Sequence, residues 1–162
     1  YIQTLFRPWD EFLEFVSSAS NPASVLHYVI PILSVFDVEL ATELACAYAL
    51  ADVTNLFFKW PLRGDRPYWM DQRVRQFGAN TCETGFGLPS GHMQVTVAVY
   101  SLVALRLRSK RFTGIFTAIT LLTALSRVHM GAHTPFQVLC GLLAGAATCA
   151  AVRLARPVLL SW

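Results

Sequence analysis

Five long apolar blocks run through this 162-residue chain and limit the folds it can adopt. We place them at residues 22–36, 40–58, 93–107, 112–125 and 135–155. Hydrophobic residues make up 54% of the sequence and charged residues only 14%, whereas about a quarter of an ordinary soluble domain is charged. A membrane-spanning helix needs about 17–25 residues, so the second and fifth blocks suffice alone and the others need flanking residues. We therefore predict an all-α, multi-span transmembrane bundle of about five membrane helices.

The domain organisation follows from the same blocks. We expect a single membrane domain over residues 1–162, with its chemical motifs within residues 59–137, and we expect it to be a fragment because the chain starts at Tyr1 and stops after an apolar run. The net charge of +3 is too small for a nucleic-acid footprint. The four cysteines have no metal-binding spacing, so we predict neither a disulfide framework nor a zinc site. They are Cys46, Cys82, Cys140 and Cys149.

Basic residues suggest an orientation for the bundle. One cluster lies between the third and fourth blocks and at the end of the fifth, and the positive-inside rule makes that side cytoplasmic. It consists of Arg106, Arg108, Lys110, Arg111, Arg153 and Arg156. The long loop on the opposite side, residues 59–91, is also basic. It carries Lys59, Arg63, Arg66, Arg73 and Arg75. Because these cations conflict with the rule, we predict that they serve chemistry.

Three segments at the ends of the blocks carry the residues suited to chemistry. Lys59 and Arg66 follow the second block, Pro89-Ser90-Gly91-His92 opens the third, and Arg127 and His133 lie between the fourth and fifth. If each block crosses the membrane, all of these ends share one face. Three cations and two histidines then converge at one mouth of the bundle. This arrangement predicts an anion site.

The residue types indicate phosphate chemistry. Arginine offers a fork of donors that matches phosphate oxygens, and lysine adds a compact charge. We expect Lys59, Arg66 and Arg127 to neutralise charge in the transition state, with Ser90 and Gly91 presenting the start of a helix. One histidine can attack phosphorus while the other protonates the leaving oxygen. The motifs contain no acidic metal cluster, so the reaction is expected to need no metal.

Each of these residues also has an ordinary interpretation. Lys59 and Arg66 could be interfacial cations, and Pro-Ser-Gly is common in turns. We interpret His27 and His129 as membrane-interface histidines. Asp52 lies inside the second block, about two turns before Lys59, and we predict that it supports the site from behind.

The three segments together resemble a known signature. Lys59-x6-Arg66-Pro67, Pro89-Ser90-Gly91-His92 and Ser126-Arg127-x5-His133 are similar in order and spacing to the three motifs of the type 2 phosphatidic acid phosphatase (PAP2) superfamily. An aspartate usually follows the nucleophilic histidine of that superfamily by four residues, and Gln137 stands there in this chain. Glutamine is found at this place in the glucose-6-phosphatase branch. Further similar stretches are Phe58-Lys59-Trp60, Arg66-Pro67-Tyr68-Trp69, Gln76-Phe77 and the run from Cys82 to His92, with Asp52 and Asn55 ahead of them.

This resemblance implies roles for individual residues. His133 would be the nucleophile that forms a phosphohistidine, and His92 would be the proton donor. Lys59, Arg66 and Arg127 would hold the phosphate, helped by Ser90 and Gly91. Gln137 would give the imidazole of His133 a neutral hydrogen bond. No cofactor is implied.

The resemblance also implies a setting. The expected enzyme is a glucose-6-phosphatase-like phosphoric monoester hydrolase of gluconeogenesis with a PAP2-like helical core. It would sit in the endoplasmic reticulum membrane as a multi-pass protein, with its active site facing the lumen. Its partners would be the lipid bilayer, a sugar phosphate as substrate and a sugar-phosphate transporter.

Other functions are compatible with parts of this pattern. A lipid phosphate or polyprenyl pyrophosphate phosphatase of the same superfamily is the main alternative, and the stretch from Trp69 to Gln76 is shorter than is usual in the glucose-6-phosphatase branch. A non-enzymatic membrane protein could keep the pocket for binding or transport, but pure binding does not need two titrating histidines. A haloperoxidase would need vanadate in the pocket and a soluble scaffold, which the apolar blocks do not provide.

Overall fold

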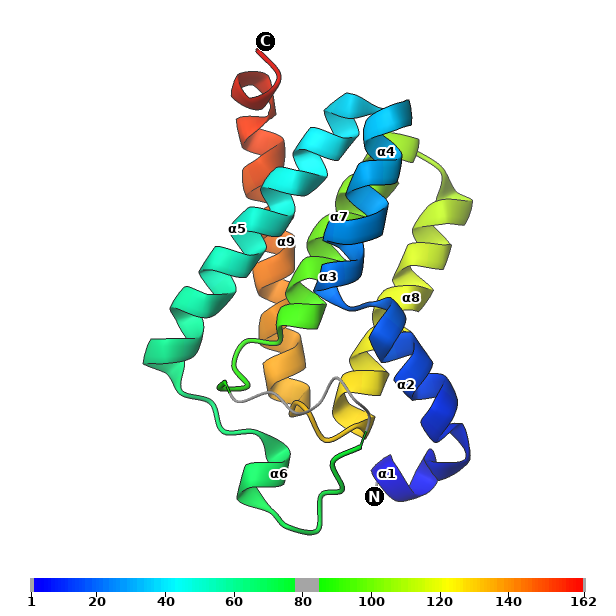
Figure 1. Cartoon of the computed structure of the whole chain (residues 1–162), viewed down its shortest axis with the longest axis vertical. Helices are drawn as coiled ribbons and strands as arrows, with labels where there is room; N and C mark the ends of the chain where they lie inside the picture. The colour runs from blue at the N-terminus through cyan, green and yellow to red at the C-terminus, as the bar shows by residue number, and fades with distance from the viewer. Residues whose placement is uncertain (1, 78–84, 162) are drawn as a thin grey trace.

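The computed structural model describes residues 2–77 and 85–161 of the chain, and every regular element in these ranges is helical. Four long helices run along the bundle (Figure 1). They are α5 (Val38–Leu62), α7 (Gly91–Leu107), α8 (Lys110–His129) and α9 (Pro135–Leu159). Together with the segment Pro22–Phe36, they match the five apolar blocks of the sequence. The all-helical prediction is therefore confirmed for the described residues.

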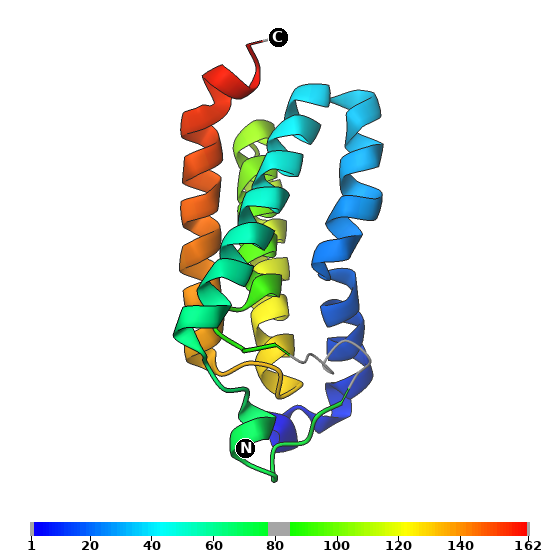
Figure 2. The same ribbon diagram turned by 60° about the vertical axis from the view of Figure 1, so that its left-hand side comes forward.

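The N-terminal residues 2–36 form a bent rod of short helices along one side of the bundle, opposite α9 (Figure 2). Its elements are α1 (Ile2–Leu5), the 3₁₀ turn η1 (Arg7–Trp9), α2 (Asp10–Ala19), α3 (Pro22–Ser24), the π-helical turn η2 (Val25–Val29) and α4 (Ile30–Phe36). The rod bends by 49° after α2. Asn21 restarts the helix there, because its side chain accepts a hydrogen bond from the N–H of Ala23 and Pro22 occupies the first helical position. α2 packs on α8, and α4 packs on α5.

Helix α7 is central, because it packs against α5, α8 and α9. The core between them consists mostly of small and branched apolar side chains, among them Leu44, Ala47, Ala51, Val95, Ala98, Val99, Leu102, Cys149 and Val152. Gly141 and Gly145 lie on the face of α9 that meets α7. A Cβ atom at either position would lie 2.5 Å from a backbone carbonyl oxygen of the α7 side, that of Ser90 or that of Gln94. Glycine at both positions therefore permits the close approach of the two helices.

The outer surface of the bundle is apolar. Large side chains such as Phe36, Leu154 and Val158 are exposed, which suits a lipid environment rather than water. Among the described residues, the helices α8 and α9 are long and apolar enough to span a membrane, and the bent rod Arg7–Ala19 with Pro22–Phe36 is a third candidate. The expected five spans are thus only partly recovered, because α7 has 17 residues and α5 carries several charged side chains.

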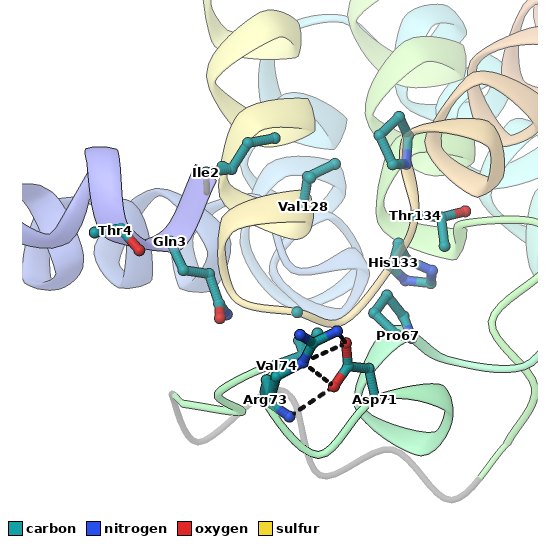
Figure 3. A pocket seen from close by; sticks show the side chains of 12 residues that line it. Ile2, Gln3, Thr4, Pro67, Asp71, Arg73, Val74, Val128, His133 and Thr134 are labelled. Carbon is teal, nitrogen blue, oxygen red and sulfur yellow. Dashed lines mark hydrogen bonds and ion pairs between the residues drawn. The ribbon is translucent and has the colours of Figure 1, made fainter.

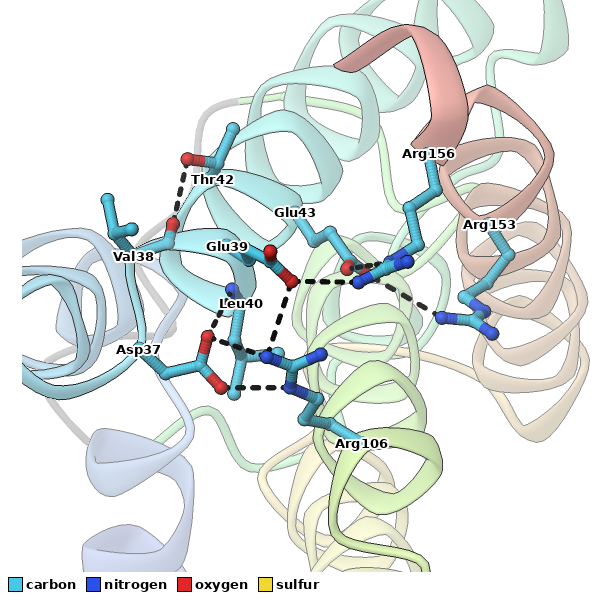
Figure 4. A network of polar contacts seen from close by, with 9 residues as sticks. All are labelled: Asp37, Val38, Glu39, Leu40, Thr42, Glu43, Arg106, Arg153 and Arg156. Atoms are coloured by element: carbon cyan, nitrogen blue, oxygen red, sulfur yellow. Dashed lines mark hydrogen bonds and ion pairs between the residues drawn. The ribbon is translucent and has the colours of Figure 1, made fainter. Parts of the chain in front are cut away.

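An ion-pair network joins three helices at the end of the bundle where α4 turns into α5 (Figure 4). Arg106 at the end of α7 pairs with Asp37 at 2.9 Å and with Glu39 at 3.4 Å. Arg156 on α9 pairs with Glu39 at 2.9 Å and with the buried Glu43 at 2.7 Å. Two arginines that we interpreted as flanking charges for orientation are therefore neutralised by carboxylates of α5 and the turn before it. This weakens the charge argument for orientation.

The contact between α7 and α9 yields a stability prediction. Gly145→Ala places a methyl group against the carbonyl of Gln94, so the two helices must separate, and overpacking of this kind costs about 1–3 kcal/mol. We expect a lower melting temperature for the detergent-solubilised protein. Gly114 on α8 is the matched control, because a Cβ atom there meets nothing within 4 Å. Gly114→Ala should leave the melting temperature unchanged or raise it, since alanine is the better helix former. Equal melting temperatures for the two variants would contradict the close-packing argument.

Candidate active site

Five predicted site residues lie on helix ends and loops that meet at the lower end of the bundle in Figure 1. Lys59 is in the last turn of α5, Arg66 precedes α6 (Pro67–Met70), His92 is the second residue of α7, Arg127 is in the last turn of α8, and His133 lies just before α9. The positive charges of Arg127, Lys59 and Arg66 all act electrostatically on His92. His133 is influenced by Arg127, Arg66 and His92 in the same way. The structure thus gathers these five residues, as the alternation of the blocks predicts.

Arg66 is completely buried and is held by backbone carbonyl groups from two loops. Its Nε donates to the carbonyl of Gly85 at 2.7 Å, and its guanidinium also donates to the carbonyls of Phe86 and Ala132 at 3.4 and 3.1 Å. These bonds connect the loop before α7 to the loop before α9. Arg66 therefore fixes the relative positions of the two loops that lead to the histidines.

His133 is oriented by a backbone group. Its Nδ1 lies 2.8 Å from the carbonyl oxygen of Gly87. A carbonyl oxygen can only accept, so Nδ1 carries the hydrogen and Nε2 keeps the lone pair. Burial lowers the pKa of His133 well below its ordinary value, and the positive charges of Arg127 and Arg66 lower it further. The ring is therefore neutral at neutral pH, with Nε2 available as a nucleophile.

Two polar side chains at the start of α7 have buried atoms without described partners. Ser90 precedes the first residue of α7, Gly91, and its Oγ is buried. His92 Nε2 is also buried, and within residues 2–77 and 85–161 neither atom has a hydrogen-bond partner. Buried polar groups are rarely left unpaired. The start of α7 is therefore arranged like a site whose partner is a bound polar group, and a helix N-terminus favours an anion.

Asn55 and Gln94 hold α5 against the start of α7. The side-chain amide of Asn55 donates to Gln94 Oε1 at 2.9 Å and to the carbonyl of Pro89 at 3.3 Å, and Gln94 Nε2 donates to Thr54 Oγ1 at 2.9 Å. Gln94 is a positioning residue that the sequence analysis missed, although a glutamine within an apolar block is a signal for such a bond. Asp52, which we expected behind the site, is exposed on α5 instead. Its place in supporting the site is taken by Asn55.

Gln137 does not provide the expected hydrogen bond to the imidazole. Its side-chain oxygen accepts from the N–H of Thr134 at 3.0 Å, and its Nε2 donates to the carbonyl of Asp65 at 2.7 Å. The hydroxyl of Thr134 in turn accepts from the N–H of Gln137 at 3.2 Å, which completes a capping box at the start of α9. Gln137 therefore positions the loop around His133, while Gly87 orients the ring.

The N-terminal rod braces the end of α8. Arg127 donates to the hydroxyl of Ser17 at 2.8 Å, and both residues are completely buried. His129 is also completely buried, and its Nε2 lies 2.8 Å from Asp10, which pairs with Arg75 at 2.5 Å. Our interpretation of His129 as an interface histidine is therefore wrong. Ser17 and Asp10 were not predicted from the sequence, because no local pattern links them to partners more than 100 positions away.

Two further cations of the long loop form ion pairs with carboxylates and lie outside the cluster of five residues. Arg75 is the partner of Asp10, and Arg73 forms a two-pronged ion pair with Asp71 through contacts of 3.0 and 2.8 Å. The Arg73 guanidinium holds the pKa of the Asp71 carboxyl at about 2. Arg63 ends α5 in the left-handed conformation and is exposed. The prediction that all basic residues of this loop serve chemistry is thus too broad.

The sequence predicts neither a zinc site nor a disulfide framework, and the described residues can be compared with both predictions. In residues 2–77 and 85–161, no group of three or more His, Cys, Asp or Glu side chains is placed to hold a metal ion. Cys46, Cys140 and Cys149 are free thiols. Cys82 and the two residues after it, which belong to one of the similar stretches, lie outside the described residues.

A comparison with known protein families gives a match over most of the chain. The sequence profile described as "PAP2 superfamily" matches residues 40–159. The matched region runs from the start of α5 to the end of α9 and includes all five clustered residues.

Curated relatives are glucose-6-phosphatases by name. The chain is 29% identical to glucose-6-phosphatase 2 from Homo sapiens over 90% of its own length and 49% of that protein. It is 32% identical to glucose-6-phosphatase catalytic subunit 1 from Canis lupus familiaris, with 91% and 48% covered, and 33% identical to glucose-6-phosphatase 3 from Rattus norvegicus, with 81% and 44% covered. The chain thus spans about half the length of the curated relatives it matches.

A solved structure supports the fold. The crystal structure of Aquifex aeolicus LpxE superposes with a TM-score of 0.71, covering 90% of this chain and 85% of the other, at 20% sequence identity. At this identity the likeness concerns the helical architecture alone.

The environment of His133 predicts its titration. Since burial disfavours the charged ring, protonation should occur only well below pH 6.5, the ordinary value for histidine. The pH dependence of histidine ¹⁵N chemical shifts in the detergent-solubilised protein measures this, with His133→Gln assigning the signal. A protonation midpoint at or above pH 6.5 would contradict the buried, cation-flanked environment.

Proposed function

The chain belongs to the PAP2 superfamily, and from that membership we propose that it is the catalytic part of a membrane phosphatase that hydrolyses a sugar phosphate, glucose 6-phosphate, through a phosphohistidine. One observation carries the proposal. Two imidazoles and three cations from five separate segments meet in one cluster, and all of them except Lys59 are buried. Such a cluster suits a phosphate dianion flanked by a nucleophile and an acid.

In the first step, the lone pair of His133 Nε2 attacks phosphorus, and the bond from phosphorus to the sugar oxygen breaks. His92 gives its proton to that oxygen as it leaves, so the sugar departs as a neutral alcohol. Lys59, Arg66 and Arg127 stabilise the charge that spreads over the three equatorial oxygens. The phosphate dianion balances the positive charges around His92 and thereby favours the protonated ring that this step requires.

In the second step, water attacks the phosphohistidine. Neutral His92 takes a proton from the water as the bond between phosphorus and Nε2 breaks, which regenerates both histidines and releases inorganic phosphate. Ser90 Oγ and the start of α7 are placed to contact the phosphoryl group in both steps. The nucleophile, the acid and the cations in both steps are side chains of the protein, so we expect turnover to persist in a strong chelator.

The setting of the enzyme follows from the same family. We propose that all five helical rods cross or enter the membrane, with α5 and α7 shielded by their neighbours. We also propose the endoplasmic reticulum as the location, with the site on the lumenal side. A sugar phosphate must then cross the membrane before it is hydrolysed, so a sugar-phosphate transporter is the proposed partner.

The catalytic roles of the histidines can be separated. His133→Ala should abolish turnover and the acid-labile phosphoenzyme that rapid quenching with ³²P-labelled substrate traps. His92→Ala should slow hydrolysis of an alkyl phosphate by about 100-fold or more and should slow p-nitrophenyl phosphate less, because that leaving group needs no proton. His27→Ala, at an exposed position on the rod, is the control. A phosphoenzyme in His133→Ala would exclude His133 as the nucleophile.

Substrate class is tested by comparing kcat/KM for glucose 6-phosphate with that for a short-chain lipid phosphate in detergent, using membranes that contain the chain. We expect the sugar phosphate to be the better substrate, and competitive inhibition by vanadate with both. A preference for the lipid phosphate would favour the second candidate, a lipid phosphate or polyprenyl pyrophosphate phosphatase, which the superfamily also includes.

A further inference from the structure

The N-terminal rod, residues 2–36, reaches the five clustered residues through one buried side chain. Ser17 of α2 accepts a hydrogen bond of 2.8 Å from Nη1 of Arg127, and both side chains are completely buried. We propose that Ser17 is a positioning residue that holds the guanidinium of Arg127 in the orientation that binds phosphate, so that the rod is part of the phosphate site. This inference rests on the proposed phosphatase function and adds a residue from outside the three motifs.

The orientation of Arg127 matters to both histidines. Of the charged groups that act on His92 and on His133, Arg127 has the largest effect on each. A guanidinium binds phosphate through a planar fork of donors, so a rotation of this plane changes which oxygens the donors can reach. Fixing a long side chain also costs entropy. A partner that fixes Arg127 before the anion arrives removes this cost from the binding step.

A serine hydroxyl suits this role. Leu13 and Ser17 are the buried residues of α2, and they share one helix face because they lie four residues apart. A polar side chain on such a face is rarely left unpaired, and Arg127 provides its partner. An apolar side chain here would deprive the guanidinium of this acceptor, whereas a carboxylate would cancel part of its positive charge. A neutral acceptor leaves that charge to act on phosphate.

Asp10 holds the rod against the same end of α8. Its Oδ1 lies 2.8 Å from Nε2 of His129, which is completely buried and follows Arg127 by two residues. Asp10 precedes Ser17 by seven residues, or about two turns, so both side chains lie on one face of α2. The two contacts therefore join this face to the last turn of α8, against which α2 packs. This arrangement fixes the distance between Ser17 and Arg127.

Gln3 adds a third contact between the rod and the end of α8. Figure 3 shows α1 beside the last turn of α8, with Gln3 near the turn that leads to α9. Nε2 of Gln3 donates to the carbonyls of His129 at 2.8 Å and of Arg75 at 2.6 Å, and its Oε1 accepts from the N–H of Arg75 at 2.9 Å. The rod is thus anchored at three places along its length, which makes it a rigid support for the site.

Removing the hydroxyl tests the proposal. Ser17→Ala deletes the acceptor, and Ser20→Ala is the matched control, because the buried hydroxyl of Ser20 donates to carbonyls of its own rod, those of Val16 and Ser17. Isothermal titration calorimetry of the detergent-solubilised chain measures the affinities for orthovanadate and inorganic phosphate. We expect both affinities to fall by about tenfold or more in Ser17→Ala and to stay unchanged in Ser20→Ala. A melting curve of each variant ensures that folded proteins are compared.

A conservative substitution separates the hydroxyl from the packing of the helix. Ser17→Thr keeps the hydroxyl and should bind vanadate more tightly than Ser17→Ala. The positioning role is overturned by an unchanged affinity in Ser17→Ala, by an equal loss in Ser20→Ala, or by a folded Ser17→Thr that recovers no affinity. If Ser17→Ala does not fold, Ser17→Cys decides by the same criteria, because a thiol is only a weak acceptor.

A second measurement needs neither turnover nor a bound anion. The positive charge of Arg127 lowers the pKa of His133, so displacement of the guanidinium should raise it. We expect histidine ¹⁵N chemical shifts to report a higher pKa for His133 in Ser17→Ala than in Ser20→Ala, and equal values overturn the proposal. A chain that hydrolyses no phosphomonoester but shows these differences refutes the proposed function alone. Normal turnover with equal vanadate affinities in the two variants refutes the positioning role alone.

Discussion

The structure depends on holding buried arginines in fixed orientations beside two histidines. Taking a guanidinium out of water is costly unless its donors are satisfied. Arg66 meets this requirement with carbonyls of the loops before α7 and before α9, and Arg127 is braced by Ser17 of the N-terminal rod. Both arginines therefore also act as ties between segments far apart in the sequence. The bonds that make the burial of Arg66 tolerable also place the loops that lead to His92 and His133.

Close packing of α7 supplies the rigidity that the site needs. The glycines of α9 bring its backbone against the start of α7, and Asn55 with Gln94 fixes α5 against the same point. The start of α7 therefore has little room to move, and a phosphate-binding helix N-terminus must hold its N–H groups in place. Preorganised dipoles need no reorganisation when charge develops in the transition state. The glycines of α9 and the polar pair Asn55 and Gln94 thus both hold the start of α7 in a fixed position.

The sequence predicts the parts of this arrangement that depend on periodic or local patterns. The apolar blocks correspond to the helices. Successive long helices run in opposite directions, so the end of one and the start of the next lie on the same face, and this brings Lys59 and His133 together. Contacts that depend on side-chain direction or on distant partners were not predictable in the same way. Asp52 lies off the buried stripe of α5 formed by Leu44, Ala47, Ala51 and Asn55, and Gly87 orients His133 through a carbonyl that every residue type possesses.

The end of the bundle away from the site shows how this fold uses arginine to hold helices together. There, Arg106 and Arg156 pair with carboxylates of α5 and of the turn before it, which joins three helices and neutralises charge. At the other end, Arg66 and Arg127 connect distant segments through bonds to backbone carbonyls and to the hydroxyl of Ser17. A neutral acceptor fixes the orientation of a guanidinium without cancelling its charge. These bonds therefore position the two arginines and leave their positive charge to act on His92 and His133.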